Sequence, residues 1–311
     1  MTSKGKSLLV LFILLTCLGG FSYFCFATQK GNSLLNSILP KKEPAELEIF
    51  RKCYPDVNFD AAFDEEVSDW KITVTAPVFV NGKETKVRDF YWAEGRLLPK
   101  EELSSKDHYW KMIYPYRPLK DPALMNEEEI ERVRNFSSAE NRRNGSGSPM
   151  FFCDFLYAAK SRIIIEDHIV NTTFLGKKTR VHERIHSILK QVEKEILLAA
   201  ESDLKVKDFV TNLKSADCYH WREIAGTGRK SFHTYGIAID LLPKSLGGKA
   251  IFWSWTKDKD PKNWMLTPLS ARWSPPEKVI GIFEQHGFIW GGNWVIFDNM
   301  HFEFRPELLK N

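Results

Sequence analysis

A helical period of hydrophobic residues is clearest between residues 181 and 200. Apolar side chains recur there every three or four positions, and polar ones occupy the rest of each turn. The apolar stripe consists of Val181, Ile185, Ile188, Val192 and Ile196. This spacing predicts one long amphipathic helix over residues 181–200, packed on the core by a single face.

Alternating apolar and polar positions mark the predicted strands. The segment 70–92 is rich in β-branched and aromatic residues on both sides of Asn81-Gly82, a dipeptide typical of tight hairpins. Strand-like runs follow at 163–170 (IIIEDHIV), 237–240 (IAID) and 301–304 (HFEF). These runs predict short strands, and the Asn-Gly dipeptide predicts that at least one pair is antiparallel.

Shorter helices are predicted at 46–54 (ELEIFRKCY), at 127–136 behind the capping residue Asn126, and at 150–161. Helices and strands do not alternate regularly along the chain. The predicted fold class is therefore α+β, with a small antiparallel sheet and flanking helices.

The N-terminal segment differs from the rest of the chain. No charge interrupts residues 8–27, and Lys4 and Lys6 precede them. An apolar run of this length can span a bilayer, and a basic start followed by an apolar middle is also typical of a secretory signal. We expect residues 1–27 to be a signal peptide or membrane anchor, with the anchor favoured, and residues 28–45 to be a linker. The remainder is then exported to the cell envelope, either membrane-anchored or periplasmic or extracellular.

Composition narrows the classes of function. Hydrophobic residues make up 43% of the chain, enough for a sizeable core. The net charge is +4, with Lys and Arg spread along the sequence, so a nucleic-acid partner is not expected. Cys53, Cys153 and Cys218 are far apart with no CxxC pair, which allows one disulfide but does not support a cysteine zinc site. Nothing in the sequence indicates an oligomeric state.

The segment HERIH, residues 182–186, matches H-E-x-x-H, in which two histidines one helical turn apart bind zinc beside a glutamate. The apolar stripe passes one position before each histidine, so His182 and His186 are predicted at a solvated helix edge. A third ligand is also required, and for this role Glu201 is merely available. We favour a surface helix here over a zincin site.

Two later segments, SFHTYGIAIDLLP (231–243) and the end of GFIWGGNWVIFDNMHFEF (287–304), carry more chemistry. Alone, a His and an Asp near a strand are more often a structural pair. Together, His233, Asp240 and His301 supply the nitrogen and carboxylate ligands of a catalytic zinc, which keeps a position for water and lowers its pKa to roughly 7. We predict one Zn²⁺ ion on these three residues, with Asp298 accepting the proton of water and donating it to the leaving amine.

In combination, SxHxxGxAxD and GFxWGGxW…DxxHFE resemble the zinc D-alanyl-D-alanine carboxypeptidase and L-alanyl-D-glutamate endopeptidase family, which cuts bacterial cell-wall peptides. The likeness covers about residues 210–305. It implies a Hedgehog/D,D-peptidase-like zinc domain and a peptidoglycan peptide substrate. The family's general base is Asp in the endopeptidase branch, so Asp298 implies an L-alanyl-D-glutamate endopeptidase, with D-alanyl-D-alanine carboxypeptidase as the alternative.

The resemblance also implies roles for residues around the metal. Arg222 occupies the position of the family's upstream arginine, implied to stabilise negative charge on the substrate. Without the resemblance, a surface salt bridge is the plainer interpretation of Arg222. Ser231, Trp294 and Glu303 stand in the motifs at positions implied to contact the substrate or support the ligands.

We divide the exported chain into an accessory region, 46–149, and a zinc peptidase domain, 150–311. A Trp-rich insertion at 244–279 separates the motifs and either walls the cleft or packs on itself. The alternative from another class of function is a non-catalytic cell-wall-binding protein with a structural metal site.

Overall fold

The computed structural model describes residues 41–80 and 82–310 of the 311-residue chain. The predicted signal or anchor, most of the predicted linker and Asn81 lie outside these residues. Among the residues described, no helix is both long and apolar enough to cross a bilayer. Residues 44–311 form one compact unit.

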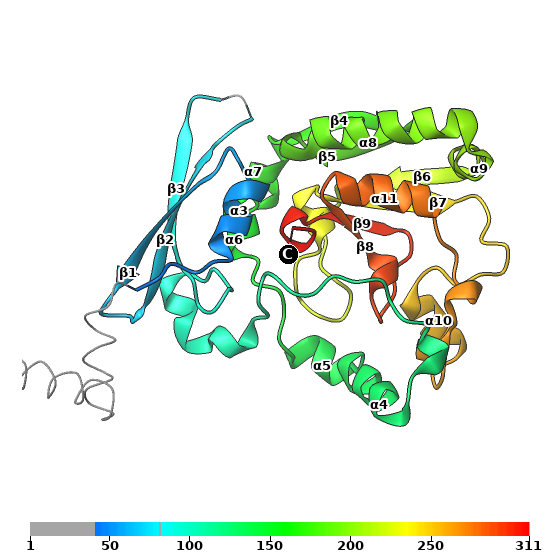
Figure 1. Cartoon of the computed structure of the whole chain (residues 1–311), viewed down its shortest axis with the longest axis horizontal. Coiled ribbons are helices and arrows are strands. Elements are labelled where there is room, and N and C mark those ends of the chain that lie inside the picture. Colours follow the sequence, from blue (N-terminus) through cyan, green and yellow to red (C-terminus); the bar gives the residue numbers. More distant parts are fainter. Residues whose placement is uncertain (1–40, 81, 311) are drawn as a thin grey trace, which may run out of the picture. The chain divides into compact units, whose positions relative to one another are not determined.

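A helix and a three-stranded sheet open this unit (Figure 1). They are α3 (Leu47–Cys53), β1 (Asn58–Asp64), β2 (Asp69–Pro77) and β3 (Thr85–Tyr91). The strands lie in the order β1-β2-β3 and both pairs are antiparallel, as the sequence predicts for β2 and β3. Their connection is longer than a two-residue Asn-Gly turn, because Val78 and Glu84 close it with a hydrogen bond between Val78 N and Glu84 O of 2.9 Å.

Short helices follow the sheet. They are η1 (Lys100–His108), η2 (Pro122–Leu124), α4 (Glu127–Phe136), α5 (Ala139–Asn144), α6 (Phe151–Leu156) and α7 (Arg162–Glu166). Asn126 caps α4 as predicted: its side chain accepts from Glu129 N, and the Glu129 carboxylate accepts from Asn126 N, each at 2.9 Å.

One prediction in this region is wrong, and one predicted helix is shorter than expected. The segment 163–170 is not one strand, because Ser161 caps the helix α7 and only Ile165 of its three isoleucines is buried. The helix predicted over 150–161 ends at Leu156, since Ala158 adopts a left-handed backbone conformation with φ of 52°.

A hairpin and two helices come next: β4 (Ile169–Phe174), β5 (Lys177–His182), α8 (Glu183–Ser202) and α9 (Leu204–Thr211). The long amphipathic helix is confirmed, but it begins two residues later than predicted. Val181 and His182 belong to β5, which pairs with β4 in an antiparallel hairpin.

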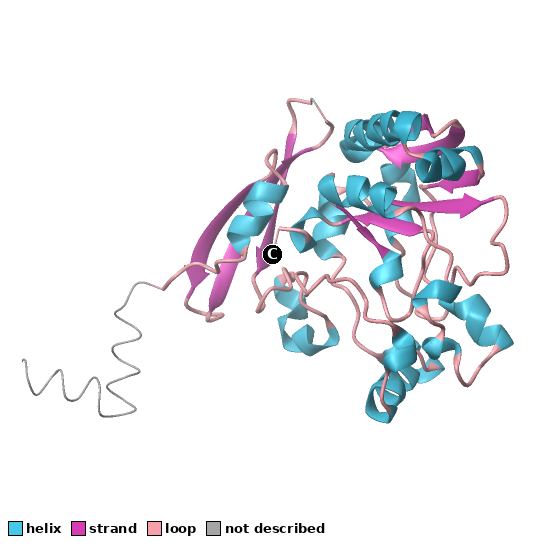
Figure 2. Cartoon of the chain, turned by 45° about the vertical axis from the view of Figure 1, so that its right-hand side comes forward, coloured by secondary structure: helices cyan, strands magenta, loops and turns pink. Residues whose placement is uncertain are grey.

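The remaining elements surround a four-stranded antiparallel sheet of order β6-β7-β9-β8. They are β6 (Leu213–Asp217), η3 (Phe232–Tyr235), β7 (Ala238–Pro243), α10 (Trp253–Lys259), η4 (Trp264–Leu266), η5 (Leu269–Ala271), α11 (Glu277–Gln285), β8 (Phe288–Trp290), η6 (Gly291–Asn293), β9 (His301–Phe304) and η7 (Pro306–Leu308). Mixed helices and small antiparallel sheets make the fold α+β, as predicted (Figure 2).

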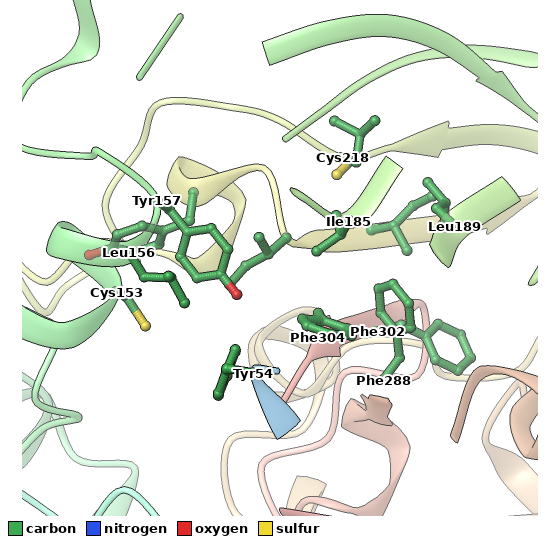
Figure 3. Close-up of a cluster of buried hydrophobic side chains, with 14 of the residues drawn as sticks. Tyr54, Cys153, Leu156, Tyr157, Ile185, Leu189, Cys218, Phe288, Phe302 and Phe304 are labelled. Atoms are coloured by element: carbon green, nitrogen blue, oxygen red, sulfur yellow. The ribbon is translucent and has the colours of Figure 1, made fainter. Parts of the chain in front are cut away.

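The apolar face of β9 anchors the sheet in the main core. Phe302 stacks on Phe283 of α11 with ring centroids 4.1 Å apart, and Phe304 meets Phe288 of β8. Figure 3 shows Phe302, Phe304 and Phe288 together, with Ile185 and Leu189 of α8 close by. This core also includes residues of α3 and the first sheet, from Leu47 onward.

The Trp-rich insertion contributes to a second, smaller hydrophobic core, which also includes Ile130 of α4. Trp253 and Trp264 pack together with Phe297 from the segment before β9, whereas the side chain of Trp255 is 49% exposed. Backbone hydrogen bonds join the insertion to that segment, from Trp253 N to Phe297 O and from Asn299 N to Ile251 O. The insertion therefore packs against Ile130 of α4 and against the loop that carries Asp298.

Candidate metal centre

Adjacent strands of the central sheet bring two of the predicted ligands together. Asp240 on β7 lies directly opposite His301 on β9, and paired residues of neighbouring strands project from the same face. The alternating partners Ile239 and Phe302 enter the core on the other face. Alternation along each strand therefore aims Asp240 and His301 away from the core, as the sequence predicts.

The third predicted ligand, His233, comes from the turn before β7. It lies on η3, and Gly236 ends that turn in a left-handed conformation with φ of 64°. A Cβ atom at position 236 would lie 2.9 Å from His182 N, so both the backbone angle and the packing require glycine. This turn folds His233 back over the strand that carries Asp240.

The three side chains fit a tetrahedral zinc site. His233 Nε2 lies 3.2 Å from His301 Nδ1 and 3.2 Å from Asp240 Oδ1, and His301 Nδ1 lies 2.9 Å from Asp240 Oδ1. Two donors that each lie about 2.1 Å from one ion at a tetrahedral angle are about 3.4 Å apart. Among the described residues, His233, Asp240 and His301 form the group of possible metal ligands whose donor atoms lie close enough together to hold one ion.

Hydrogen bonds on the far sides of both imidazoles orient them. His233 Nδ1 donates to Cys218 O at 2.6 Å, and His301 Nε2 lies 3.1 Å from Glu303 Oε2. Such outer partners leave the opposite ring nitrogen free for a metal. The two free nitrogens are the ones that face Asp240.

Charges in the cluster favour a bound cation. Burial acts to raise the pKa of Asp240, but the adjacent imidazoles of His233 and His301 hold it well below its usual range. Burial acts to lower the pKa of His301, but Asp240 and Glu303 raise it to about 10. Without a metal, a proton on His301 therefore balances the carboxylates. A metal ion competes with that proton for His301, so the affinity of the three side chains for the metal rises with pH.

Asp298 lies beside this cluster and is half-buried. Burial and the charge of Asp240 raise the pKa of Asp298 to about 7, against the opposing effects of His301 and Arg222. Its Oδ1 atom is buried without a hydrogen-bond partner among the described residues. Its backbone N–H donates to Gly291 O at 3.1 Å, which fixes the loop. A carboxyl group with this pKa can both accept and donate a proton near neutrality.

The other predicted residues surround the ligands. Arg222 Nη2 lies 3.9 Å from Asp240 Oδ2, with its side chain 44% exposed. Ser231 is buried and caps η3, because its Oγ accepts from His233 N. The ring of Trp294 lies 5.5 Å from that of His301. Glu303 holds the Nε2 atom of His301, as described above.

Comparison with known families supports this centre. Residues 225–304 match the family model described as D-alanyl-D-alanine carboxypeptidase. The resemblance inferred from the two motifs is therefore confirmed. Residues 46–114 match the model of a domain of unknown function, and no solved structure gives a significant match to the chain.

The HERIH segment belongs to the structural framework. His182 ends β5 instead of lying on the helix, and it is 1% exposed, so the predicted solvated edge is wrong for this residue. Its backbone N–H donates to Gly236 O at 3.0 Å, and burial lowers its pKa to about 3. His186 lies 3.1 Å from the hydroxyl of Thr172. His182 thus supports the turn that carries His233.

A chain of buried polar groups leads away from the metal centre, and the sequence gives no sign of it. Glu303 lies near Arg305, whose Nε donates to Glu307 and whose Nη2 donates to Met112 O. Glu307 in turn accepts from the hydroxyl of Tyr54 at 2.9 Å. The alternating pattern of β9 places only Glu303 on the same face as His301. Tyr54 and Met112 are distant in sequence, so no pattern connects them to this chain of polar groups.

The three described cysteines are unpaired. Cys153 and Cys218 are buried, and Cys53 is half-buried. Cys218 contributes to the centre through its backbone, by the carbonyl group that accepts from His233.

Proposed function

We propose that this chain is a zinc-dependent peptidase that hydrolyses stem peptides of bacterial cell-wall peptidoglycan. The observation that carries the proposal is the close grouping of donor atoms from His233, Asp240 and His301 beside the carboxyl group of Asp298. The family match over residues 225–304 supports the substrate class. The donor set of two imidazoles and one carboxylate suits one Zn²⁺ ion with a position left for substrate or water.

The residues of the site then have distinct roles. When bound, zinc supplies a Lewis acid that acidifies water and polarises a carbonyl group. Asp298 takes a proton from the attacking water and gives it to the leaving amine. Arg222 donates hydrogen bonds to the oxygen on which negative charge develops. Ser231 and Glu303 hold His233 and His301 in place, and Trp294 covers one side of His301.

The bond between L-alanine and D-glutamate is the one we propose is cut. Asp298 in the base position and the GGxW sequence around Trp294 support an L-alanyl-D-glutamate endopeptidase. D-alanyl-D-alanine carboxypeptidase is the second candidate, because it is the description of the family model that matches.

Mass spectrometry of purified peptidoglycan after digestion separates the two. New fragments with a D-glutamate amino terminus support the endopeptidase, whereas released D-alanine moves the proposal to the carboxypeptidase. Intact peptidoglycan with the zinc-loaded protein refutes both.

The non-catalytic alternative is tested with one variant. A wall-binding protein that keeps the metal for structure retains its biological activity in Asp298→Ala, whereas a peptidase loses it and still binds zinc. We further propose that residues 1–27 direct export to the cell envelope, as a membrane anchor, and that residues 46–149 are an accessory region of the peptidase.

A further inference from the structure

A cavity of about 650 Å³ opens beside the metal centre. His233, Asp240 and Arg222 line it together with Lys178, Thr179 and Arg180 of β5. These two cations precede the family match by more than forty residues of sequence, so no motif assigns them a role.

Strand alternation explains why both cations face outward. On β5, Thr179 and Val181 are buried, whereas Lys178 and Arg180 point to the opposite face and are exposed. Asn171 lies directly opposite Arg180 on β4 and also lines the cavity. The exposed face of the hairpin is thus one wall of the cavity.

Hydrogen bonds fix this wall relative to the metal ligands. The hydroxyl of Thr179 accepts from Cys218 N at 3.1 Å, and the carbonyl of Cys218 accepts from His233 at 2.6 Å. Tyr219 N donates to Arg180 O at 2.8 Å. The wall is therefore two hydrogen bonds away from a metal ligand, and its position does not depend on a free loop.

The heads of both cations are open to a ligand. Within the part of the chain that the structure describes, neither Lys178 nor Arg180 forms an ion pair. The guanidinium of Arg180 lies over the ring of Tyr219 at 4.9 Å, an arrangement that leaves its N–H edges accessible. Glu166, the carboxylate whose pKa Arg180 helps to lower, is already hydrogen-bonded by Arg162 at 2.9 Å.

The cavity also has an excess of positive charge. Lys178, Arg180 and Arg222 line it against Asp217 and Asp240, and Asp240 is committed to the metal centre. A guanidinium and an ammonium group side by side are well suited to a carboxylate, which Arg binds with two parallel hydrogen bonds.

We infer that Arg180 and Lys178 form a subsite for a carboxylate of the substrate, which selects acidic peptides. The inference rests on the proposed function and narrows it to peptides that carry a free carboxylate near the bond that is cut. Such a carboxylate belongs either to a glutamate residue within the peptide or to the C-terminus. The internal group fits an endopeptidase and the terminal one a carboxypeptidase.

Binding, measured apart from hydrolysis, tests the subsite. Isothermal titration calorimetry compares three forms of one stem peptide: the free acid, the form with its glutamate carboxylate amidated, and the form with its C-terminus amidated. The zinc-loaded protein carries Asp298→Asn to prevent turnover, with or without Arg180→Gln and Lys178→Gln. Both substituted positions are exposed, and thermal melting checks that the fold is kept.

We expect Arg180→Gln with Lys178→Gln to weaken binding of the free acid about tenfold or more. The double variant should bind one of the two amidated peptides as tightly as the parent does. That peptide is the one in which amidation has removed the recognised carboxylate, so the result also identifies this carboxylate. Arg132→Gln, an exposed arginine on α4, is the matched control and should bind as the parent does.

Equal affinity of parent and double variant for all three peptides overturns the subsite, even if the wild-type chain hydrolyses peptidoglycan. Carboxylate-dependent binding without hydrolysis by the wild-type chain keeps the subsite and refutes the proposed function.

Discussion

Among the three proposed ligands, His233 depends most on its local turn, because it comes from η3 and not from a strand. We expect His233→Ala to lose hydrolysis and to reduce bound zinc from about one ion per chain to a small fraction of that, since two ligands do not make a closed site. Metal analysis of the purified variants measures the loss. His186→Ala is the matched control, and zinc loss in His186→Ala but not in His233→Ala would restore the zincin hypothesis for HERIH.

The raised pKa of Asp298 predicts a pH-dependent cost of keeping this carboxyl group buried. Its pKa rises from 3.8 to about 7, mainly through burial, so the folded state favours the protonated acid. Stability from this group is present below about pH 4 and is lost as the pH rises through about 7. Asp298→Asn should therefore raise the melting temperature of the metal-free protein at pH 8 and change it little at pH 4, while abolishing hydrolysis.

Calorimetry at both pH values with and without zinc checks this expectation. Bound zinc adds positive charge beside Asp298, so the difference between wild type and variant should shrink when zinc is added. The exposed Asp258→Asn should show no such pH dependence. Equal melting temperatures of Asp298→Asn and wild type at pH 8 would contradict the burial argument.

Gly291 lies close to the backbone of Asp298, the proposed general base. A Cβ atom at this position would lie 2.6 Å from Asp298 O, so Gly291→Ala must displace the backbone that carries the base. A displacement of about 1 Å can cost a hundredfold in rate, so we expect kcat to fall at least tenfold while zinc stays bound. Gly281→Ala on α11 is the control, because nothing lies within 4 Å of its Cβ. An unchanged kcat in Gly291→Ala would show that the loop adapts.

At the level of elements, alternation on β7 and β9 predicts the direction of two of the three proposed ligands, Asp240 and His301, whereas His233 comes from the turn η3. Isoleucine and phenylalanine at the intervening positions commit one face of each strand to the core, which leaves Asp240 and His301 on the other. The start of α8 was less predictable, since Val181 continues the helical stripe although it lies on β5. Hydrophobic spacing cannot distinguish a strand that leads directly into a helix from the helix itself.

Contacts between distant segments are what the sequence does not reveal. The approach of β5 to the candidate metal centre depends on Cys218, and the buried polar chain ends at Tyr54, which is distant in sequence. Each of these contacts joins residues that share no motif or period. Their pairing follows from the packed fold and becomes visible only there.

The buried polar chain predicts that the C-cap of α3 contributes to stability. Tyr54→Phe removes the hydrogen bond to Glu307 and leaves a buried carboxylate oxygen unsatisfied, which should cost about 1–3 kcal/mol of unfolding free energy. Tyr91→Phe is the matched control, because its partner Asp64 is half-exposed and can bond to water instead. Urea unfolding measures both, and a loss in Tyr54→Phe no larger than in Tyr91→Phe would count against the argument.

For the molecule as a whole, the domain boundary predicted between residues 149 and 150 has a direct physical test. One hydrophobic core includes Leu47 and Phe50 of α3 together with Phe302 and Phe304 of β9. Glu307 also accepts a hydrogen bond from Tyr54, so a fragment of residues 150–311 exposes apolar surface and leaves one carboxylate oxygen of Glu307 without its partner, although Arg305 still pairs with the other.

We therefore expect the fragment 150–311 to unfold at a lower temperature than residues 44–311, or to lack a cooperative transition. Circular dichroism melting of both proteins, each with zinc, makes the comparison at equal metal occupancy. Adding residues 44–149 as a separate chain should restore part of the lost stability, because the same core can then reassemble. A fragment 150–311 that melts cooperatively at the temperature of the longer protein would instead show that the peptidase folds as an independent domain, and that α3 and the first sheet only rest on its surface.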